Sequence, residues 1–333
     1  MKKPSIAIVG AGFSGIILAQ KLKNIGEVKI FEKARGVGGR MASRVKDDFN
    51  FDFGAQFFIA KKPEFREFLK PFIEQKIIMP WCGNFAEIDD YKATYLREWP
   101  EQKNHFVPVI KMNQFCKELS QDLDITLQTR VAKIEKKEKK WQIFDDKNEF
   151  LGEFDWLFFS IPAPQLLELI PQNCNFFEAT KKIKMMGCFA LMLGLEKPLK
   201  IPYDVALVKN SIISWISSEN SKPQRKNSAS YTILARNDWA DHNMEIDIEE
   251  VKKQLIAEFA KIIQQPIENI IHQDIHRWRY ANIAKQKNNV KFFIDNKMQL
   301  GACGDWLIQG RVEASYLSAS ALFNEISKNF NNF

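Results

Sequence analysis

Three glycines, Gly10, Gly12 and Gly15, follow the apolar run SIAIV with the spacing GxGxxG. Between a strand and a helix, the first glycine permits a tight turn, the second lets the main chain approach a pyrophosphate, and the third allows close packing. The amides that begin the helix, with the Ser14 hydroxyl, would then donate to phosphate oxygens. Glu32 ends the next strand-like run, VKIFE, where a carboxylate accepts hydrogen bonds from a ribose diol. A glycine-rich structural turn would not need Glu32, so the pattern favours a bound dinucleotide.

Two further stretches distinguish FAD from NAD as that dinucleotide. RGVGGRM is followed by a polar turn and FDFGAQFF, and ACGDWLIQGRVEAS lies near the C-terminus. In this order they resemble motifs of the amine-oxidase-like FAD superfamily, and its renalase-like branch fits best. VPVIKMNQFCKEL, SWISSENSKPQR, ARNDWADH and HRWRYA resemble the same branch, so the resemblance covers nearly the whole chain. Two positions depart from it, since KPQR stands for the usual KPGR and Ala240 stands for a serine.

The resemblance implies non-covalent FAD as the cofactor. Arg40 would approach its phosphates, Asp305 would accept hydrogen bonds from the ribityl hydroxyls, and the main chain of Val131 would contact adenine. Residues 54–56 would lie near the isoalloxazine ring. Cys303 lies in no segment resembling the covalent attachment site of amine oxidases, so we expect no flavin–cysteine bond. The expected cofactor-binding residues are Gly10, Gly12, Ser14, Gly15, Glu32, Lys33, Gly39, Arg40, Met41, Gly54, Ala55, Gln56, Val131, Gly304, Asp305, Val312, Glu313 and Ala314.

A flavin accepts a hydride itself, so the protein mainly has to orient and desolvate the substrate ring. Aromatic walls suit that task, although large aromatic residues are more often part of a core. We assign no certain catalytic side chain. Lys222 and Arg225 could hold substrate phosphates or lie in a solvated loop, and His242 and His276 are more readily interpreted as structural. The expected substrate-binding residues are Gln56, Trp215, Trp278, Tyr280, Trp306 and Arg225.

Proteins of the renalase-like branch are described as oxidases of misreduced nicotinamide dinucleotides. The resemblance therefore implies that 2- or 6-dihydro isomers of NAD(P)H give a hydride to flavin N5, with O2 as the acceptor and H2O2 and NAD(P)+ as products. A flavin amine oxidase or desaturase of the same fold, acting on a small amine, is the alternative. A nucleotide-sensing or nucleic-acid-binding module is a third hypothesis, suggested by the pI near 9.0.

The 333 residues carry a net charge of +7, but the basic residues are not gathered into one binding surface. The densest basic run, IEKKEKKWQI, lies between two strand-like segments and is typical of a solvated hairpin tip. The run EKARGVGGRMASR lies inside a cofactor motif, so we expect no nucleic-acid partner. The five cysteines form no CxxC pair and the histidines no metal-binding spacing, which argues against disulfides and a metal site. Without a signal peptide or membrane-spanning run, we expect a cytoplasmic protein.

The pattern of apolar residues predicts a βαβ unit at the start, from SIAIV through a helix over 14–22 to VKIFE. In the middle, CFALMLGLE, VALVKN, SIISWIS, SYTILARN and IHRWRYAN are strand-like runs that indicate an antiparallel or mixed sheet. One strong helix, over 247–263, interrupts them. A strand in MQLGACGD and a helix over about 313–326 follow at the end of the chain.

The predicted fold is therefore α/β, with a Rossmann-like FAD-binding domain and an inserted α+β substrate domain on a mixed or antiparallel sheet. The expected FAD-binding domain is discontinuous and comprises residues 1–60, 105–165 and 285–333. The expected substrate domain comprises residues 61–104 and 166–284.

Overall fold

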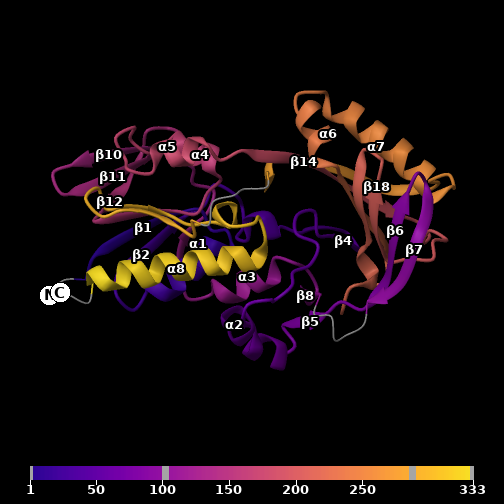
Figure 1. The fold of residues 1–333 in the computed structure, drawn as a ribbon, viewed down its shortest axis with the longest axis horizontal. Helices are drawn as coiled ribbons and strands as arrows, with labels where there is room; N and C mark the ends of the chain where they lie inside the picture. Colours follow the sequence, from indigo (N-terminus) through magenta and orange to yellow (C-terminus); the bar gives the residue numbers. More distant parts are fainter. Residues whose placement is uncertain (1–2, 100–104, 285–289, 331–333) are drawn as a thin grey trace. The chain divides into compact units, whose positions relative to one another are not determined.

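The computed structural model describes residues 3–99, 105–284 and 290–330. The chain divides into two compact units (Figure 1). The first unit comprises Met1–Arg40, Cys116–Met185 and Ile283–Phe333, and the second comprises Met41–Phe115 and Met186–Asn282. Each unit has its own sheet and its own core.

The first unit contains a six-stranded sheet that is parallel except at one edge. Its order is β19-β20-β13-β1-β2-β9, and only β19 pairs antiparallel. The continuous apolar run of β1 is buried because parallel strands are covered on both faces. These strands are β1 (Ser5–Val9), β2 (Glu27–Phe31), β9 (Asp124–Thr126), β13 (Trp156–Phe159), β19 (Phe293–Asp295) and β20 (Leu300–Ala302).

Helices α1 (Phe13–Leu22) and α8 (Val312–Phe330) pack on each other in this unit. A smaller antiparallel sheet is formed by β10 (Val131–Lys137), β11 (Lys140–Asp145) and β12 (Phe150–Phe154). The basic run 134–143 forms the β10–β11 hairpin, as the sequence predicts. The remaining helices here are α3 (Gln114–Leu119), which starts in the second unit, α4 (Ala163–Leu167) and α5 (Phe177–Lys181).

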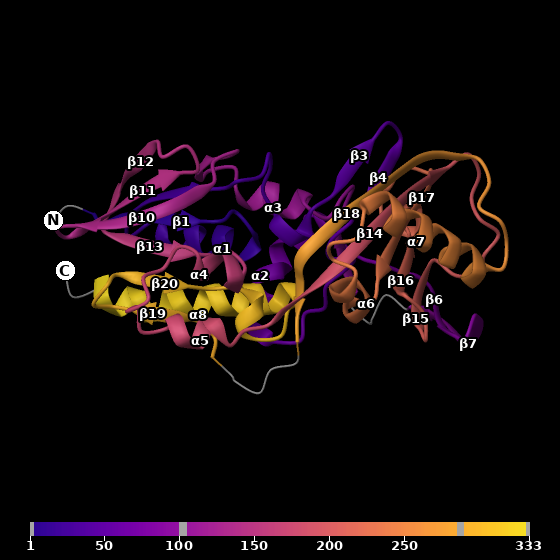
Figure 2. The ribbon, with the colours of Figure 1, turned by 90° about the horizontal axis from the view of Figure 1, so that it is seen from above.

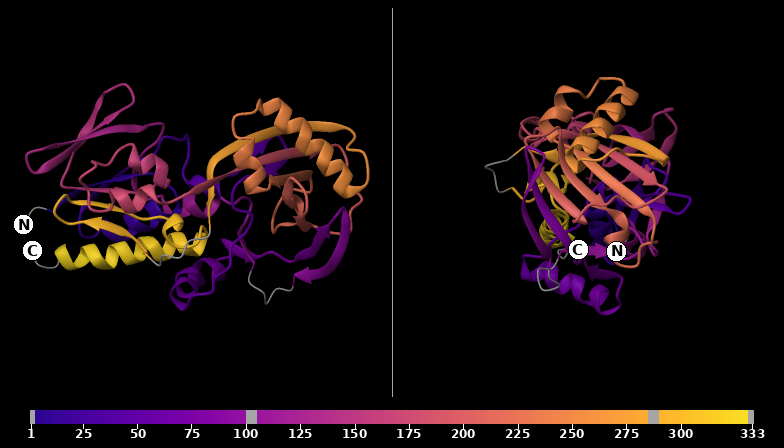
Figure 3. Two further views of the ribbon diagram at one scale, coloured as in Figure 1. Left: turned by 45° about the horizontal axis from the view of Figure 1, so that its top comes forward. Right: turned by 90° about the vertical axis from the view of Figure 1, so that its right-hand side faces the viewer.

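The second unit is built on a seven-stranded mixed sheet, of order β18-β14-β17-β16-β15-β6-β7. β15 pairs parallel with β6, whereas β6–β7, β15–β16, β16–β17 and β14–β17 are antiparallel. The hairpin of β6 and β7 forms one edge (Figure 3). The strands are β6 (Gly83–Asp89), β7 (Lys92–Trp99), β14 (Met185–Leu195), β15 (Val205–Lys209), β16 (Ile213–Ser218), β17 (Ala229–Ala235) and β18 (Ile270–Ile283).

Helix α7 (Ile248–Ile263) lies over one face of this sheet (Figure 2). Its N-cap is Asp247, whose carboxylate accepts hydrogen bonds from the amides of residues 249 and 250. Its apolar side is buried in the core, and it ends at Gln264 in the left-handed conformation. The other elements are α2 (Pro63–Glu74), α6 (Asn237–His242), the hairpin β3 (Arg44–Lys46) and β4 (Phe49–Phe51), and the pair β5 (Ile78–Pro80) and β8 (Phe106–Pro108).

The observed fold confirms the predicted α/β class with a Rossmann-like unit and a mixed sheet. The units divide the chain differently from the expected domains over residues 41–60, 105–115, 166–185 and 283–284. Residues 41–60 and 105–115 lie in the second unit, because β8 pairs with β5 and the Phe49 ring packs beneath Gly194 of β14. Residues 166–185 lie in the first unit, where Phe176 stacks on Phe293 at 5.3 Å. The functional domain boundaries stay a prediction.

Within the described ranges, no helix is both long enough and apolar enough to span a bilayer.

Candidate functional site

The glycine loop between β1 and α1 has the geometry that a close-approaching ligand requires. Gly10 has a φ of +102°, and a Cβ there would lie 3.0 Å from the Ser160 carbonyl oxygen. A Cβ on Gly15 would lie 2.1 Å from the Gly10 carbonyl oxygen, so helix and strand meet at that glycine. A Cβ on Gly12 would lie 4.0 Å from the carbonyl and hydroxyl oxygens of Ser160, an ordinary contact distance, so this glycine is not crowded by the protein. The Ser160 hydroxyl oxygen is buried nearby without a partner in the described chain.

Glu32 holds the shape of the loop from the end of β2. One carboxylate oxygen accepts the Ala11 amide at 2.8 Å and the other accepts the Ala34 amide at 2.8 Å. Each oxygen keeps a further lone pair for an added donor, because a carboxylate offers about four acceptor positions. The Glu32 side chain is thus fixed by the protein and still able to accept hydrogen bonds from a diol.

Arg40 and Asp305, which lie far apart in the sequence, form a bidentate ion pair in the first unit. One Arg40 nitrogen donates to Asp305 Oδ2 at 3.0 Å, and the other donates to Oδ1. Their side chains are 28% and 10% exposed. Gly39 has a φ of +54°, and its ideal Cβ would lie 3.2 Å from the Cα of Gly12. The arginine therefore projects from a turn that touches the glycine loop.

Residues 53–57 of the second unit are bordered by aromatic rings from β18. Trp278 stacks on Phe53 with ring centres 5.4 Å apart, and its indole N–H donates to the Phe53 carbonyl at 2.8 Å. The His276 ring lies 4.3 Å from Trp278 and 4.9 Å from Phe53. Burial, with the nearby charge of Arg44, lowers the pKa of His276 to about 4. His276 is therefore an uncharged aromatic neighbour at neutral pH.

A second aromatic cluster surrounds Phe57. The ring centres of Trp99, His105 and Trp215 lie 5.2, 5.0 and 5.6 Å from that of Phe57. Trp99 also stacks on His105 at 3.9 Å. The indole N–H groups of Trp99 and Trp215 are buried and have no acceptor in the described part of the chain.

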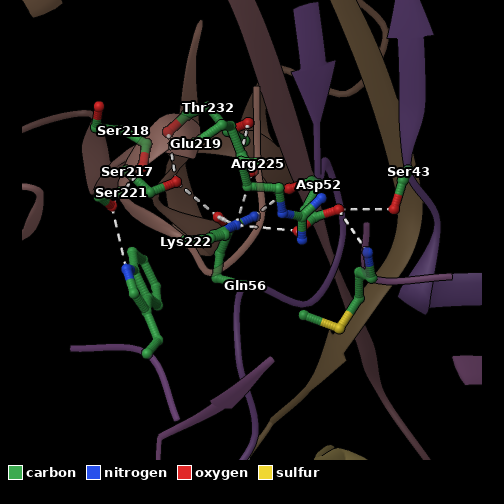
Figure 4. Close-up of polar contacts among 12 residues, drawn as sticks. Ser43, Asp52, Gln56, Ser217, Ser218, Glu219, Ser221, Lys222, Arg225 and Thr232 are labelled. Carbon is green, nitrogen blue, oxygen red and sulfur yellow. Dashed lines mark hydrogen bonds and ion pairs between the residues drawn. The ribbon is translucent and has the colours of Figure 1, made fainter. Parts of the chain in front are cut away.

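Four charged side chains form a buried cluster next to residues 53–57 (Figure 4). Lys222 Nζ lies 3.1 Å from Asp52 Oδ2 and 2.9 Å from Glu219 Oε2, and Arg225 Nη2 lies 2.7 Å from the same Asp52 oxygen. None of the four side chains is more than 1% exposed. We call Asp52, Glu219, Lys222 and Arg225 the buried charge cluster.

Neutral donors complete the buried charge cluster. Asp52 also accepts the Ser43 hydroxyl at 2.6 Å and the Met112 amide at 2.8 Å, and Glu219 accepts the Thr232 hydroxyl at 2.7 Å. Burial acts to raise the pKa of Asp52, but Lys222, Arg225 and these donors together lower it. Burial raises the pKa of Glu219, against the opposing effect of Lys222. The pKa values of the two carboxylates in this cluster are thus shifted in opposite directions.

The Gln56 side chain is folded back into the protein beside this cluster. Its Oε1 accepts the Ser217 hydroxyl at 2.7 Å and lies 3.4 Å from Lys222 Nζ. Its Nε2 donates to the carbonyl oxygens of Asp52 and Gly54, the latter at 3.2 Å. The amide therefore has internal partners at both ends.

Two protein-family models match the sequence of this chain. A model described as "NAD(P)-binding Rossmann-like domain" matches residues 8–72. A model described as "Flavin containing amine oxidoreductase" matches residues 83–290, which is more than half of the chain. The chain belongs to the flavin containing amine oxidoreductases. This flavin oxidoreductase is FAD-dependent.

Curated relatives of this flavin oxidoreductase match it over very different shares of the chain. Renalase from Mus musculus is 24% identical over 302 residues, covering 84% of this chain and 85% of renalase. The 4,4'-diapophytoene desaturase of Staphylococcus aureus (strain Newman) is 50% identical over 50 residues, 15% of this chain and 10% of the desaturase.

Solved structures share the fold over nearly the full chain. The putative protoporphyrinogen oxidase from Exiguobacterium sp. 255-15 has a TM-score of 0.79 at 12% identity, covering 99% of this chain and 100% of that one. Putrescine oxidase bound to putrescine has a TM-score of 0.72 at 12% identity, covering 98% and 99%. At this identity the likeness establishes the fold alone.

The donor set of the first unit fits FAD. The uncrowded Gly12, the fixed acceptors on Glu32, the Arg40 guanidinium and the buried Ser160 hydroxyl suit a diphosphate and a ribose. Val131 is buried at the start of β10, and α8 begins at Val312. Cys303 is fully buried, and burial raises the pKa of its thiol to about 12, so it is not a reactive thiolate.

Several predicted substrate residues have internal roles in the structure. Trp306 is 1% exposed, donates its N–H to the Ile161 carbonyl at 3.0 Å, and belongs to the core of the first unit. Arg225 is held by Asp52 and by main-chain carbonyls, so its expected contact with substrate phosphates has no support in this arrangement. Trp278 and Tyr280 follow His276 at every second position of β18, so the three residues lie on the same face of the strand, and both Trp278 and Tyr280 are half-buried.

No pattern in the sequence predicted that Asp52, Glu219, Ser217 and Thr232 belong to one network. Lys222 was expected at a phosphate or in a solvated loop, and it is buried instead. The only local signal was a charged or polar residue inside an apolar run, as in FDF and SWISSE. Asp52 pairs with Lys222 170 positions away, whereas Glu219 lies three residues before Lys222 in the same segment.

Proposed function

We propose that this flavin oxidoreductase oxidises misreduced, 2- or 6-dihydro isomers of NAD(P)H. When bound, FAD supplies the hydride acceptor at N5 and passes the electrons to O2, so that the dihydro isomer, O2 and H+ give NAD(P)+ and H2O2. The support from sequence is the renalase similarity along 84% of the chain. Residues 54–56 are proposed to face the isoalloxazine ring, as the family resemblance implies.

The observation that carries the proposal is the aromatic border of residues 53–57. Phe53 and Trp278 stack, and the neutral imidazole of His276 meets both rings edge-on. The guanidinium carbon of Arg44 lies 5.0 Å from the centre of the Phe53 ring. The neighbouring carboxylates Asp52 and Glu219 are buried and paired with Lys222, so neither can pair with a substrate ammonium. Such surroundings suit a planar, uncharged dihydronicotinamide ring, which needs orientation and desolvation rather than a general base.

The protein side chains would act by positioning and by excluding water. Aromatic faces hold a flat ring in one orientation, and a neutral His276 adds no charge that would compete with hydride loss. Arg40, whose guanidinium is oriented by Asp305, would contribute a positive charge beside the cofactor diphosphate.

Anaerobic mixing with a panel of reductants tests this proposal. Borohydride-reduced NAD+, which contains the 2- and 6-dihydro isomers, should bleach the flavin absorbance much faster than ordinary β-NADH does. Each isomer, purified and tested separately with its NADP counterpart, then identifies the preferred ring position. Faster bleaching by β-NADH than by the isomer mixture would refute the substrate assignment.

A small amine is the second candidate substrate, and the aromatic cluster around Phe57 favours it. Trp215 is partly exposed, and the electron-rich face of its ring would attract an ammonium group by cation–π interaction. Putrescine and an aromatic amine belong in the same anaerobic panel. Bleaching by either amine, without bleaching by the dihydronicotinamide isomers, would establish this second function instead.

A further inference from the structure

The main chain of residues 52–57 has an unusual distribution of hydrogen bonds. Three consecutive carbonyl oxygens, at residues 52, 53 and 54, accept hydrogen bonds from side chains. Gln56 Nε2 occupies the first and third, and Trp278 Nε1 occupies the second. The amide N–H groups of Gly54 and Ala55 have no hydrogen-bond partner in the described chain, and both residues are half-exposed.

This distribution makes the segment a donor-rich edge. A ligand meeting it finds two N–H groups without partners and carbonyl oxygens that each already accept one hydrogen bond, so acceptor atoms on the ligand are favoured. Because buried or half-buried polar groups are stabilised by finding partners, the favoured ligand is a ring system with carbonyl and imine acceptors. The isoalloxazine ring is of this chemical class.

Lys222 determines which way the Gln56 amide points. An amide can occupy its site in two orientations that exchange oxygen and nitrogen. Lys222 Nζ and the Ser217 hydroxyl both lie next to Gln56 Oε1, and an ammonium group is only a donor. The oxygen must therefore face Lys222, and the NH2 group must face the carbonyl oxygens of Asp52 and Gly54.

Lys222 is itself held in place on three sides. Its ammonium contacts Asp52, Glu219 and Gln56, and it lies 5.1 Å from the centre of the Trp81 ring. Asp52 is both a partner of Lys222 and the first residue of the segment that Gln56 caps. The Lys222 ammonium therefore contacts the donor-rich edge at two points, the Asp52 carboxylate and the Gln56 side-chain oxygen.

We propose that Lys222 is a positioning residue that, through Gln56, keeps the Gly54 and Ala55 amides available to acceptor atoms of the bound flavin ring. This inference rests on the proposed placement of residues 54–56 at that ring. Reduced flavin carries more negative charge on its acceptor atoms than oxidised flavin, so preorganised N–H donors bind the reduced form more tightly.

The decisive experiment measures the two-electron midpoint potential of the FAD-loaded protein in matched lysine variants. Lys222→Met keeps the side-chain length and removes the charge. Lys226→Met is the control, because Lys226 pairs with Asp48 in the same region but is 60% exposed. We expect Lys222→Met to lower the preference for reduced over oxidised FAD about tenfold, a potential about 30 mV more negative. Lys226→Met should leave the potential unchanged.

Two further variants separate positioning from stability. Glu219→Gln combined with Lys222→Met removes both charges of one buried pair, which commonly restores stability. Gln56→Met removes the amide and leaves all four charges of the buried charge cluster in place. Both should show the same loss of preference for reduced FAD, even where the free energy of unfolding is close to wild type. A wild-type potential in both would overturn the proposal.

The result is distinguishable from the outcome of the substrate test. A shifted potential in the Lys222 and Gln56 variants supports the positioning role even if no dihydronicotinamide isomer bleaches the wild-type flavin. Unchanged potentials overturn the role even if those isomers prove to be the substrates.

Discussion

Arg40–Asp305 in the first unit and Arg225–Asp52 in the second are both arginine–aspartate pairs, but they have different surroundings. Arg40 is 28% exposed, whereas Arg225 is 1% exposed and Asp52 is fully buried. Asp52 accepts four donors, from Ser43, Met112, Lys222 and Arg225. The first pair is accessible to a ligand, whereas the second is shielded from one.

The difference shows that residue type alone does not identify a phosphate-binding arginine. Both arginines follow a glycine-containing or turn-forming segment, and both were expected to meet phosphates. An added anion can reach a partly exposed guanidinium, whereas a guanidinium buried against a carboxylate is shielded from it. Four measurements test this difference.

Asp52→Asn should have the largest effect. Replacing the carboxylate leaves Lys222 and Arg225 buried without full compensation, so the free energy of unfolding should fall by about 3–5 kcal/mol. Urea unfolding of the FAD-loaded protein measures this free energy of unfolding. Asp48→Asn is the matched control, since the Asp48–Lys226 pair is exposed and should leave unfolding close to wild type. Equal effects in both variants would contradict the assigned difference between buried and exposed pairs.

Arg40→Ala should weaken FAD binding rather than folding. Loss of one charge-assisted contact should raise the FAD dissociation constant about 10- to 100-fold. Fluorescence titration of the apoprotein with FAD measures this constant. Arg35→Ala is the control, because Arg35 is exposed in the same basic run. If Arg225→Ala, but not Arg40→Ala, weakened FAD binding at unchanged stability, the comparison would be reversed.

His276 provides a pH-dependent test beside a third ion pair, Arg44–Asp274. Its pKa falls from 6.5 to about 4 on folding, so the unfolded chain takes up a proton first as the pH falls. The associated stability is present above pH 6.5 and is lost as the pH falls through about 4. After allowance for solvent screening, we expect a loss of about 1–2 kcal/mol. In His276→Phe this part of the pH profile should disappear, whereas parallel profiles would refute the assignment.

Gln224→Gly should have the smallest effect. Gln224 precedes Arg225 and has a φ of +55°, a conformation that glycine adopts without steric strain. Gln224 stands where the related KPGR sequence has glycine, and its main chain adopts a left-handed conformation that is strained for glutamine. We expect a stabilisation of about 0.5–1 kcal/mol by thermal unfolding. Gln75→Gly is the control at a φ of −81°, where glycine should destabilise instead.

Local patterns allowed the sequence to predict the elements of the first unit. The run SIAIV, the glycine spacing and the apolar positions of α8 each lie within a short stretch, so β1, α1 and α8 could be located. Helix α2 was not predicted, because Pro71 inside it and its closely spaced phenylalanines hide the usual pattern. The β6–β7 hairpin was also missed, since most of β7 is exposed and lacks an apolar alternation.

The site follows the same division between local and distant signals. The Gly10 to Gly15 loop and Glu32 form one continuous motif, which fixes their geometry. No such motif joins Asp52 to Lys222 and Glu219, and burial of a lysine cannot be read from its neighbours SENSKPQR. Asp52 lies in a different segment of the chain from Lys222 and Glu219, so their burial in one cluster follows from tertiary contacts that no local pattern reveals.

The interleaving of the two units has a consequence for synthesis on the ribosome. Strand β13 in the first unit pairs on one side with β1 and on the other with β20 (Leu300–Ala302). Every residue of the second unit precedes β20 in the chain. The second unit can therefore complete its sheet during translation, while β13 keeps an unpaired edge until residues 300–302 emerge. A chain stalled before that point would expose an apolar strand edge, the kind of surface that chaperones bind and that promotes aggregation.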